Sequence, residues 1–459
     1  MLVLGLGNTG LSMVRWLARH GARVTVADSR AEPPHARGLA DEHPEVPVIA
    51  GPFEAEAFSA ADAIAISPGI DRRESLVANA VKRGVPVIGD IEIFAQALRA
   101  HGDQHHELRP KVIAITGSNG KSTVTAMAGE ACAAAGRRTL VAGNIGVPVL
   151  DALGAIEAGA AMPEVIALEL SSFQLESTAT LDADAATVLN VTEDHLDRYD
   201  GMADYAAAKA RVFQGRGVQV LNRQDAWSRG MARAGRETMT FGLDRPAGAH
   251  EWGVRRESML AHGERELMPL AELPITGLHN AANALAALAL GSAVGLDDAA
   301  MLDGLRRFRG LPHRLQKVAE IRGIAFYDDS KGTNVGATVA ALSGMPVPVV
   351  LIAGGDGKNQ DFAPLAEPVR AHARAVVLIG RDAPAIERVV RGTSVPVLHA
   401  ATMEEAVDSA YRAARAADAV LLSPACASYD MFRSYVHRAE VFVEAVRALA
   451  AREGAPRGE

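Results

Sequence analysis

Two glycine-rich loops, each between an apolar run and a helical pattern, constrain this chain more than any other feature. The first, "GLGNTG", spans residues 5–10, and the second, "TGSNGKST", spans residues 116–123. A glycine loop between a strand and a helix offers backbone N–H groups and the positive end of the helix dipole to a phosphate. The sequence therefore predicts two separate α/β units, each with a phosphate-binding loop.

The rest of the chain repeats the same alternation of short apolar runs and helical stretches. Its 459 residues exceed one core, since domains average about 100–200 residues. We expect three blocks, 1–98, 99–309 and 310–459, with buried parallel strands in each. The segment "RGLPHR" (309–314) is the predicted hinge between the last two blocks, and the polar, His-rich segment 100–110 is a predicted linker.

Composition narrows the possible partners and compartment. The net charge is −8 and Lys and Arg form no block, which argues against a nucleic-acid surface. Cys132 and Cys426 lack metal-ligand spacing and indicate a reducing compartment. The longest apolar run, 284–296, is too short to cross a bilayer, so we expect a cytoplasmic protein without membrane insertion. The tail 451–459 is predicted to be disordered.

The first loop leaves three interpretations open. Gly5, Gly7 and Gly10 follow the dinucleotide-binding spacing, and Asp28 closes the next apolar run, where an acid could bind a ribose. This pattern alone suggests an NAD-dependent oxidoreductase. The helix amides could equally hold another diphosphate, such as that of a UDP-sugar. The glycines could also serve only the geometry of the turn.

The second loop is more specific. Backbone amides from Gly117 to Lys121 would surround phosphates, Lys121 would reach the β- and γ-oxygens, and Ser122 would bind Mg²⁺. A standard loop of this type has glycine six residues before the lysine, and here that position is Ile115, so the match is to a shorter variant.

Three further residues are candidates on weaker grounds. Glu169 ends a buried apolar run beside the second loop, where a Mg²⁺ ligand would lie, although a strand-end surface acid is the alternative. His195 lies among four acids in "LNVTEDHLDRYD", which could also be a solvated loop. Lys209 lies inside the Ala-rich helical stretch "YAAAKARVF", and on its own it would be an ordinary helix lysine.

Many motifs in one order resemble the Mur ligases along essentially the whole chain. The matching stretches are "GLGNTGLS", "SPGI", "GDIEIF", "AITGSNGKSTVT", "AGNIGVP", "LELSSFQLE", "NVTEDHLDRY", "AAKARVF", "HNAANALAALAL", "GLPHR", "DDSKGTNVGAT", "AGGDGKNQDF" and "LLSPACASYDMF". The resemblance implies a Rossmann-like N-terminal domain that holds the UDP of a nucleotide sugar. It also implies a central P-loop ATPase-like α/β domain and a Rossmann-like C-terminal domain that closes and brings the amino acid.

The resemblance, strongest for glutamate-adding members, also implies the reaction. ATP would phosphorylate the alanyl carboxylate of UDP-N-acetylmuramoyl-L-alanine, and the amine of D-glutamate would attack the resulting acyl phosphate. This step belongs to peptidoglycan precursor synthesis. Lys121 and two Mg²⁺ ions would supply the charge that lets an anionic carboxylate approach a triphosphate. We expect a monomer.

Residue roles follow from the same resemblance. Lys121, His195 and Lys209 would be catalytic, and the metal ligands would be Ser122, Glu169, His195 and Lys209, the last as a carbamate. The ATP contacts would be Gly117, Ser118, Asn119, Gly120, Lys121, Ser122, Thr123, Asn280, Asn283, Arg314 and Asp329. The UDP-sugar contacts would be Asn8, Thr9, Ser29, Arg30, Ser67, Pro68, Gly69, Asn144 and His195. The glutamate contacts would be Lys331, Thr333, Lys358, Ser428, Tyr429 and Tyr435.

Two positions depart from the family pattern, and several alternatives stay open. Ser29 stands where threonine is expected, and Tyr435 where phenylalanine is expected. The chain could add L-glutamate, or be another Mur ligase or a folylpolyglutamate-type ligase. From a different class, it could be an NAD oxidoreductase or a catalytically silent nucleotide-binding regulator. The combination of Lys121, Glu169, His195 and Lys209 argues against the regulator.

Overall fold

The computed structural model describes residues 1–104, 109–275 and 277–454. The chain forms two compact units. The first contains Met1–Asn190, Ala203–Met268 and Ala284–Leu305, and the second contains Val191–Met202, Pro269–Asn283 and Arg306–Glu459. Within the described residues, no helix combines the length and apolar character needed to span a membrane.

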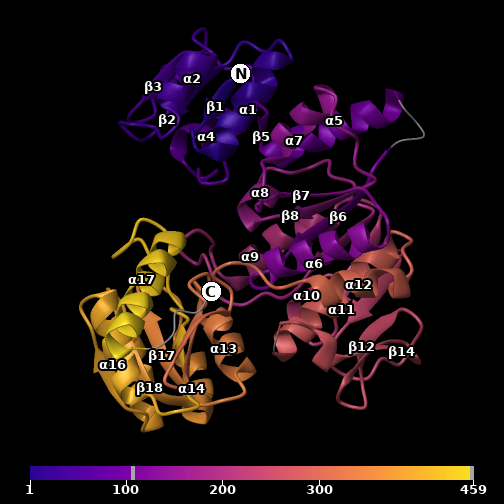
Figure 1. Ribbon diagram of the computed structural model, residues 1–459. Coiled ribbons are helices and arrows are strands. Elements are labelled where there is room, and N and C mark those ends of the chain that lie inside the picture. The colour runs from indigo at the N-terminus through magenta and orange to yellow at the C-terminus, as the bar shows by residue number, and fades with distance from the viewer. Residues whose placement is uncertain (105–108, 276, 455–459) are drawn as a thin grey trace. The chain divides into compact units, whose positions relative to one another are not determined.

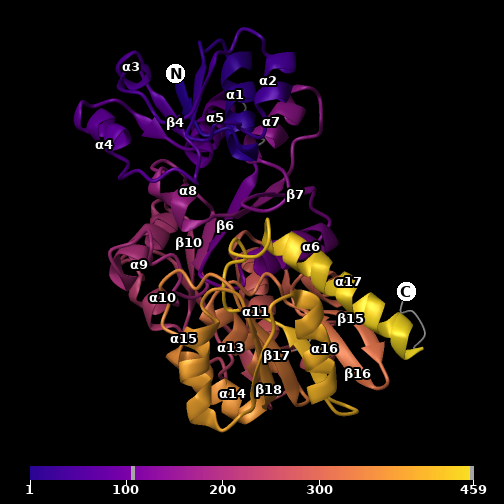
Figure 2. The same ribbon diagram turned by 90° about the vertical axis from the view of Figure 1, so that its left-hand side faces the viewer.

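The first unit opens with a parallel sheet of order β3-β2-β1-β4-β5. Its strands are β1 (Leu2–Leu4), β2 (Thr25–Asp28), β3 (Val48–Ala50), β4 (Ile64–Ile66) and β5 (Val87–Ile88). Its helices are α1 (Asn8–Arg19), α2 (Ala36–Glu42), α3 (Ala55–Ser59), α4 (Ser75–Lys82) and α5 (Asp90–Gln104). Figure 2 shows α3 and α4 on one side of the sheet and α1 on the other, so both faces of these apolar strands are covered.

The same unit continues with a nine-stranded sheet of order β14-β13-β12-β11-β10-β9-β6-β8-β7. The strands are β6 (Lys111–Thr116), β7 (Thr139–Gly143), β8 (Val165–Glu169), β9 (Ala185–Val188), β10 (Val218–Asn222), β11 (Thr238–Phe241), β12 (Glu251–Arg255), β13 (Met259–His262) and β14 (Arg265–Pro269). The pairs from β7 to β12 are parallel, and β12 pairs antiparallel with β13. Helix α6 (Lys121–Ala134), between β6 and β7 in the chain, packs against β7 and β8 (Figure 1).

The remaining helices of this region are short apart from one. They are α7 (Val149–Glu157), α8 (Ser172–Glu176), α9 (Met202–Ala210), α10 (Ala226–Gly230), α11 (Leu278–Ala293) and α12 (Asp298–Arg307), with 3₁₀ turns at Arg211–Phe213 and Leu270–Glu272. The 16-residue helix α11 forms where the Ala- and Leu-rich pattern predicts a long helix, because residues 284–290 are fully buried.

The second unit contains a six-stranded sheet of order β15-β16-β20-β17-β18-β19. The strands are β15 (Gln316–Ile321), β16 (Ile324–Asp328), β17 (Val349–Gly354), β18 (Ala373–Ile379), β19 (Val397–His399) and β20 (Ala419–Leu422). Only the β15–β16 pair is antiparallel among these neighbours in the described chain. A mostly parallel sheet of this kind collects the loops that follow its strands at one edge.

Helices cover both faces of this sheet. They are α13 (Val335–Gly344), α14 (Ala366–His372), α15 (Ala383–Val390), α16 (Met403–Ala413) and α17 (Tyr435–Glu453), with 3₁₀ turns at Ala363–Leu365 and Arg391–Thr393. One core packs Phe326, Ile352 and Val377 against α16 and α17. The other packs Leu351 and Leu378 against α13, α14 and α15. Alternate residues of one strand thus enter opposite cores.

The three α/β sheets predicted from the sequence are confirmed, and two local predictions are wrong. Residues 100–104 of the expected linker belong to helix α5, while 105–108 lie outside the described residues. The helix continues through Gly102, because one glycine costs only about 1 kcal/mol. Residues 451–453 of the expected disordered tail belong to α17, which ends at Gly454 with φ 67°. Residues 455–459 lie outside the described residues.

Candidate functional site

The first glycine loop connects β1 to α1 at the point where the strand order of the first sheet reverses. That point, between β1 and β4, is where open α/β sheets bind ligands. Asn8 and Thr9 open α1, Ser29 and Arg30 follow β2, and Ser67 to Gly69 follow β4. A Cβ atom on Gly10 would lie 1.9 Å from the Gly5 carbonyl oxygen, so close packing of helix and loop requires this glycine.

Asp28 stabilises the first loop from the end of β2. Its carboxylate accepts a hydrogen bond from the Leu6 N–H at 2.6 Å and from the Arg30 N–H and Nε at 2.9 and 2.8 Å. Ser67 Oγ donates to the Gly5 carbonyl at 3.1 Å. The Arg30 hydrogen bonds outweigh burial and lower the pKa of Asp28 to about 2. The carboxylate that could have bound a ribose therefore holds the loop and Arg30 instead.

The second glycine loop follows β6, and helix α6 begins at Lys121, directly after the loop. Gly117 and Gly120 have φ of 153° and 83°, values that favour glycine. Lys121 Nζ donates to the carbonyl oxygens of Gly117 and Ser118 at 2.8 and 2.9 Å. Its ammonium therefore lies over the loop, where a phosphate would bind.

An amide that the sequence did not single out fixes this loop. Asn190, two residues beyond β9, accepts the Asn119 N–H on Oδ1 at 2.8 Å, and its Nδ2 donates to the Asn119 carbonyl at 3.1 Å. Its own carbonyl accepts the Ser118 N–H at 2.9 Å. Asn190 thus holds the loop by both its backbone and its side chain. The sequence feature that could have identified Asn190 is its position just beyond a buried apolar run, in "TVLN".

Glu169 ends β8, the strand beside β6, and is 2% exposed. Its Oε1 accepts a hydrogen bond from Asn144 Nδ2 at 2.8 Å. Its buried Oε2 has no hydrogen-bond partner among the described residues. A buried carboxylate oxygen without a donor is costly, and a divalent cation would satisfy it. The residues present therefore fit a Mg²⁺ ion beside the loop that carries Ser122.

Lys209 lies near the end of α9 and is 1% exposed. Its Nζ donates to the Gly117 carbonyl at 2.9 Å and lies 4.3 Å from the centre of the Tyr205 ring. The Tyr205 hydroxyl in turn lies 3.3 Å from Ser118 Oγ. An exposed helix lysine would make none of these contacts, so the structure places Lys209 at the second loop.

In the second unit, the loop after β9 contacts two loops of the C-terminal sheet. Asp194 forms an ion pair with Lys358 and accepts Asn334 Nδ2 at 3.1 Å. His195 has φ 56°, and its Nε2 lies 3.6 Å from Asp194 Oδ2. Burial acts to raise the pKa of Asp194, but the charges of Lys358 and His195 and the hydrogen bonds prevail and lower it to about 2.

The predicted nucleotide contacts of the second unit lie on helix α11, directly after strand β16, and at Arg314 in the segment before β15. Asn280 and Asn283 are on α11, where Asn283 Nδ2 donates to Asn280 Oδ1 at 3.2 Å. Asp329 follows β16 and accepts the Leu315 N–H at 3.2 Å and the Ser423 hydroxyl at 2.7 Å. Burial raises the pKa of Asp329 to about 7 against the opposing effects of Ser423 and Arg314.

The predicted glutamate contacts lie in the loops after β16, β17 and β20, at one edge of the sheet. Lys331 Nζ lies 3.9 Å from the centre of the Tyr435 ring, and Tyr435 begins α17. Thr333 precedes α13, Ser428 is buried, and Tyr429 is 76% exposed. Tyr435, which stands where phenylalanine is expected, thus places an aromatic ring against Lys331.

A buried arginine connects two of these loops. Arg438 on α17 donates to Ser330 Oγ at 3.0 Å, to the Ser330 carbonyl at 2.7 Å and to the Cys426 carbonyl at 3.0 Å. It is fully buried, and burial lowers its pKa to about 10. Arg438 therefore joins the segment before Lys331 to the segment before Ser428.

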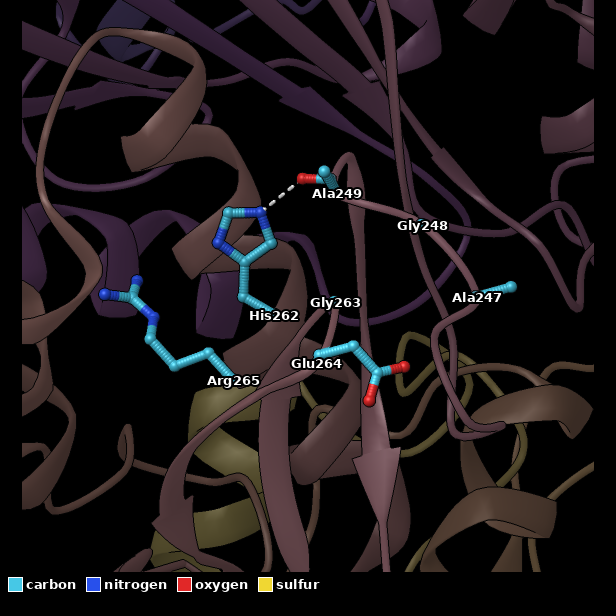
Figure 3. Close-up of a pocket in the computed structure, with 7 residues that line it drawn as sticks. All are labelled: Ala247, Gly248, Ala249, His262, Gly263, Glu264 and Arg265. Carbon is cyan, nitrogen blue, oxygen red and sulfur yellow. Dashed lines mark hydrogen bonds between the residues drawn. The ribbon is translucent and has the colours of Figure 1, made fainter.

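The structure gathers the predicted residues into two sets within separate units. Glu169, Asn144, Lys209 and the second loop belong to the first unit, and His195 belongs to the second with Lys358. A pocket of about 460 Å³ in the first unit lies elsewhere, and none of the predicted residues lines it. There His262 Nε2 faces the Ala249 carbonyl at 2.6 Å, and Glu264 and Arg265 line the opening (Figure 3).

Comparison with known proteins now defines the class. Family models match residues 1–89 (Mur ligase MurD-like, N-terminal domain), 115–291 (Mur ligase middle domain) and 313–426 (Mur ligase, glutamate ligase domain). The chain belongs to the Mur ligase family. Among solved structures it resembles UDP-N-acetylmuramate–alanine ligase of Thermotoga maritima, with TM-score 0.60, 19% identity and coverage of 98% of this chain and 99% of that one.

Within the family, the chain is similar to proteins named as D-glutamate ligases. It is 58% identical to the UDP-N-acetylmuramoylalanine–D-glutamate ligase of Methylobacillus flagellatus, covering 99% of this chain and 98% of that protein. It is also 58% identical to the ligase of the same name from Thiobacillus denitrificans, with coverages of 98% and 96%. A folylpolyglutamate synthase of Mycobacterium tuberculosis shares the fold at TM-score 0.55 and 19% identity, over 79% of this chain and 96% of that one.

Proposed function

We propose that this chain is an ADP-forming ligase that joins D-glutamate to UDP-N-acetylmuramoyl-L-alanine with ATP, through an acyl phosphate. The single observation that carries the proposal is the 58% identity to D-glutamate-adding ligases over nearly the whole chain. The second loop and Glu169 support an ATP-driven reaction, because they combine phosphate-binding amides, a lysine and a metal-ready carboxylate.

The three ligands are assigned to three parts of the chain. Residues 1–98 hold the UDP-sugar, residues 99–309 hold ATP, and residues 310–459 bind the amino acid. Asp28 supports the first assignment, because its hydrogen bonds leave Arg30 anchored beside the loop that would bind a diphosphate. One chain supplies all the predicted contacts, so the proposed enzyme is a monomer, and its nucleotide substrates place it in the cytoplasm.

Charge neutralisation is the main work of the site. Magnesium ions would be held by Ser122 and Glu169, and by His195 and Lys209, and would offset phosphate charge. Lys121 leaves its own loop carbonyls and binds the phosphate that ATP transfers. Lys331, Thr333 and Lys358 orient glutamate so that its amine meets the acyl phosphate. Because these residues lie in different units, the reaction requires domain closure, with residues 309–314 as the hinge.

Lys209 acts in this proposal as a carbamate. The Lys209 amine would lose a proton and attack CO₂, giving an anionic carbamate and releasing a second proton. A carbamate oxygen binds Mg²⁺, whereas an ammonium repels it. The position of Nζ at the Gly117 carbonyl supports this role, because it places the group at the phosphate loop.

The carbamate gives a testable prediction. Lys209→Ala should lose about 10²-fold or more of the activity, and a small carboxylate such as acetate should restore part of it by occupying the space. Lys209→Arg should not be rescued, because its bulk and charge remain. Intact mass with and without bicarbonate reports the 209 modification directly. An unmodified lysine in active enzyme, with normal turnover of the alanine variant, would refute the role.

The function itself is tested by phosphate release. Enzyme with UDP-N-acetylmuramoyl-L-alanine and ATP should release phosphate on adding D-glutamate. It should release little with L-glutamate, meso-diaminopimelate or no amino acid. Preference for L-glutamate would change the assigned substrate. Protection against thermal unfolding by NADH and not by the UDP-sugar would instead favour the oxidoreductase interpretation of the first loop.

A further inference from the structure

Asp194 makes several contacts within the second unit, and the proposed function gives this residue no role. It lies in the loop after β9, is 5% exposed, and forms an ion pair with Lys358, whose side chain is 13% exposed. The same carboxylate accepts the His195 N–H at 3.0 Å and Asn334 Nδ2 at 3.1 Å. One buried carboxylate therefore contacts two predicted site residues and the cap of a helix.

The contacts around Asp194 connect three loops. Asn334 Oδ1 accepts the Ala337 N–H at 2.8 Å and so caps α13. Gln360 Oε1 accepts the Val335 N–H at 2.9 Å. Glu193 Oε2 accepts the Asp361 N–H at 3.0 Å. The loops at 191–195, 331–335 and 357–361 are thus held together on both sides of the Asp194–Lys358 pair.

The backbone at Lys358 shows that its conformation is imposed by its surroundings. Lys358 and Asn359 have φ of 51° and 60°, in the left-handed region that costs a non-glycine residue roughly 1 kcal/mol or more. The Lys358 N–H donates to Asp356 Oδ1 at 3.1 Å, which accounts for the turn but not for the direction of the side chain. The contact that fixes the ammonium is the one with Asp194.

We propose that Asp194 is a positioning residue that holds Lys358 ready for a carboxylate of the incoming amino acid. This inference rests on the proposed role of Lys358 in binding glutamate. A lysine ammonium has three donors, so it can keep Asp194 and still bind a ligand carboxylate. A free lysine side chain loses rotamer freedom on binding, and prior anchoring removes that cost. Asp194 therefore acts on glutamate affinity rather than on the chemical step.

Steady-state kinetics of the full-length chain test this. In Asp194→Asn, which keeps the shape and removes the charge, KM for D-glutamate should rise about 10-fold or more. Its kcat at saturating glutamate should stay within about 3-fold of wild type, and KM for ATP and the UDP-sugar should be unchanged. Asp194→Glu keeps the charge and should restore part of the glutamate affinity.

A matched control and a double variant make the test specific. Glu193→Gln removes the neighbouring charge of the same loop but no contact with Lys358, so its KM for glutamate should equal that of wild type. In a Lys358→Met background, Asp194→Asn should no longer raise KM, because the residue it positions is gone.

The outcomes separate this inference from the proposed function. Wild-type enzyme that shows no D-glutamate-dependent phosphate release would refute the function itself. Active wild-type enzyme with an unchanged KM in Asp194→Asn would overturn only the positioning role. So would an equal loss of kcat at every glutamate concentration, or an effect of Asp194→Asn that persists in the Lys358→Met background. If Asp194→Asn fails to fold, Asp194→Glu carries the same comparison of KM with kcat.

Discussion

The two glycine loops of the first unit look alike in sequence and are built for different tasks. The first is held by a buried carboxylate: Asp28 accepts the Leu6 N–H and anchors Arg30. The second is held by a neutral amide, Asn190, and carries a lysine bonded to its own carbonyls. Beside it, the buried Oε2 of Glu169 lacks a hydrogen-bond partner among the described residues.

This difference agrees with the two roles proposed for the loops, holding a substrate and reacting with ATP. Both carboxylate oxygens of Asp28 accept hydrogen bonds, from Leu6 of the loop and from Arg30, so this carboxylate holds the first loop and Arg30 in one arrangement. The second site has a lysine at the loop and a buried carboxylate oxygen without a hydrogen-bond partner among the described residues, and burying that oxygen costs free energy until a metal binds it. Glycine spacing alone does not separate the two, because both loops need glycines for the same steric reason.

Removing the lysine of the second loop should produce the largest effect. Lys121→Ala should lower kcat by roughly 10²-fold or more, because one charged contact to the transferring phosphate is lost. Its melting temperature should change little, because Nζ donates to two carbonyls of its own loop and not to a distant element in these two bonds. Phosphate release and thermal melts measure both. Near-normal turnover would show that Lys121 has no role in the reaction. The proposed difference between the two loops would then fail.

A methyl group in the first loop should affect folding instead of chemistry. Gly10→Ala places a Cβ 1.9 Å from the Gly5 carbonyl and should lower the free energy of unfolding by about 2–3 kcal/mol. Gly7→Ala is the matched control, because nothing lies within 4 Å of its Cβ, and it should cost less than about 1 kcal/mol. Urea unfolding compares them, and equal losses would contradict the close-packing argument.

The charge of Asp28 gives the smallest and most pH-dependent effect. Its pKa falls from 3.8 to about 2 on folding, so its stabilisation is present above pH 4 and is lost as the pH falls through about 2. Asp28→Asn should therefore lower the free energy of unfolding by at most about 2 kcal/mol at pH 7. The gap between the variant and wild type should narrow below pH 4. A gap independent of pH would mean that shape, not charge, matters at this position.

The sequence predicts the strands that are apolar on both faces and misses those that are short or half exposed. The runs at β1, β6, β8 and β17 are fully buried apart from Lys111, so composition alone reveals them. Strand β3 has three residues, none of them buried, and β15 has one buried residue out of six. These depend on pairing with a neighbour, which no local pattern records.

The residues of the candidate site also divide into those that the sequence predicts and those that it does not. Lys121 and Ser122 are predictable because their function fixes their spacing from the loop glycines. Asn190 and Asp194 are not, because an amide or acid after a strand is equally common in solvated loops. Their importance lies in contacts with Asn119 and Lys358, which are distant in the chain. Lys209 required the family resemblance, and its burial is what the structure adds.

Arg438 has a consequence for the order in which the protein is synthesised. The arginine that fixes Ser330 is encoded 108 residues later, on α17. The loop after β16 is therefore synthesised before its anchor Arg438. Translation adds roughly 5–20 residues per second, so the loop waits several seconds for that anchor. The loop that carries the proposed amino-acid contacts Lys331 and Thr333 therefore gains its anchor late in translation, whereas the second glycine loop and its partner Asn190 are made early.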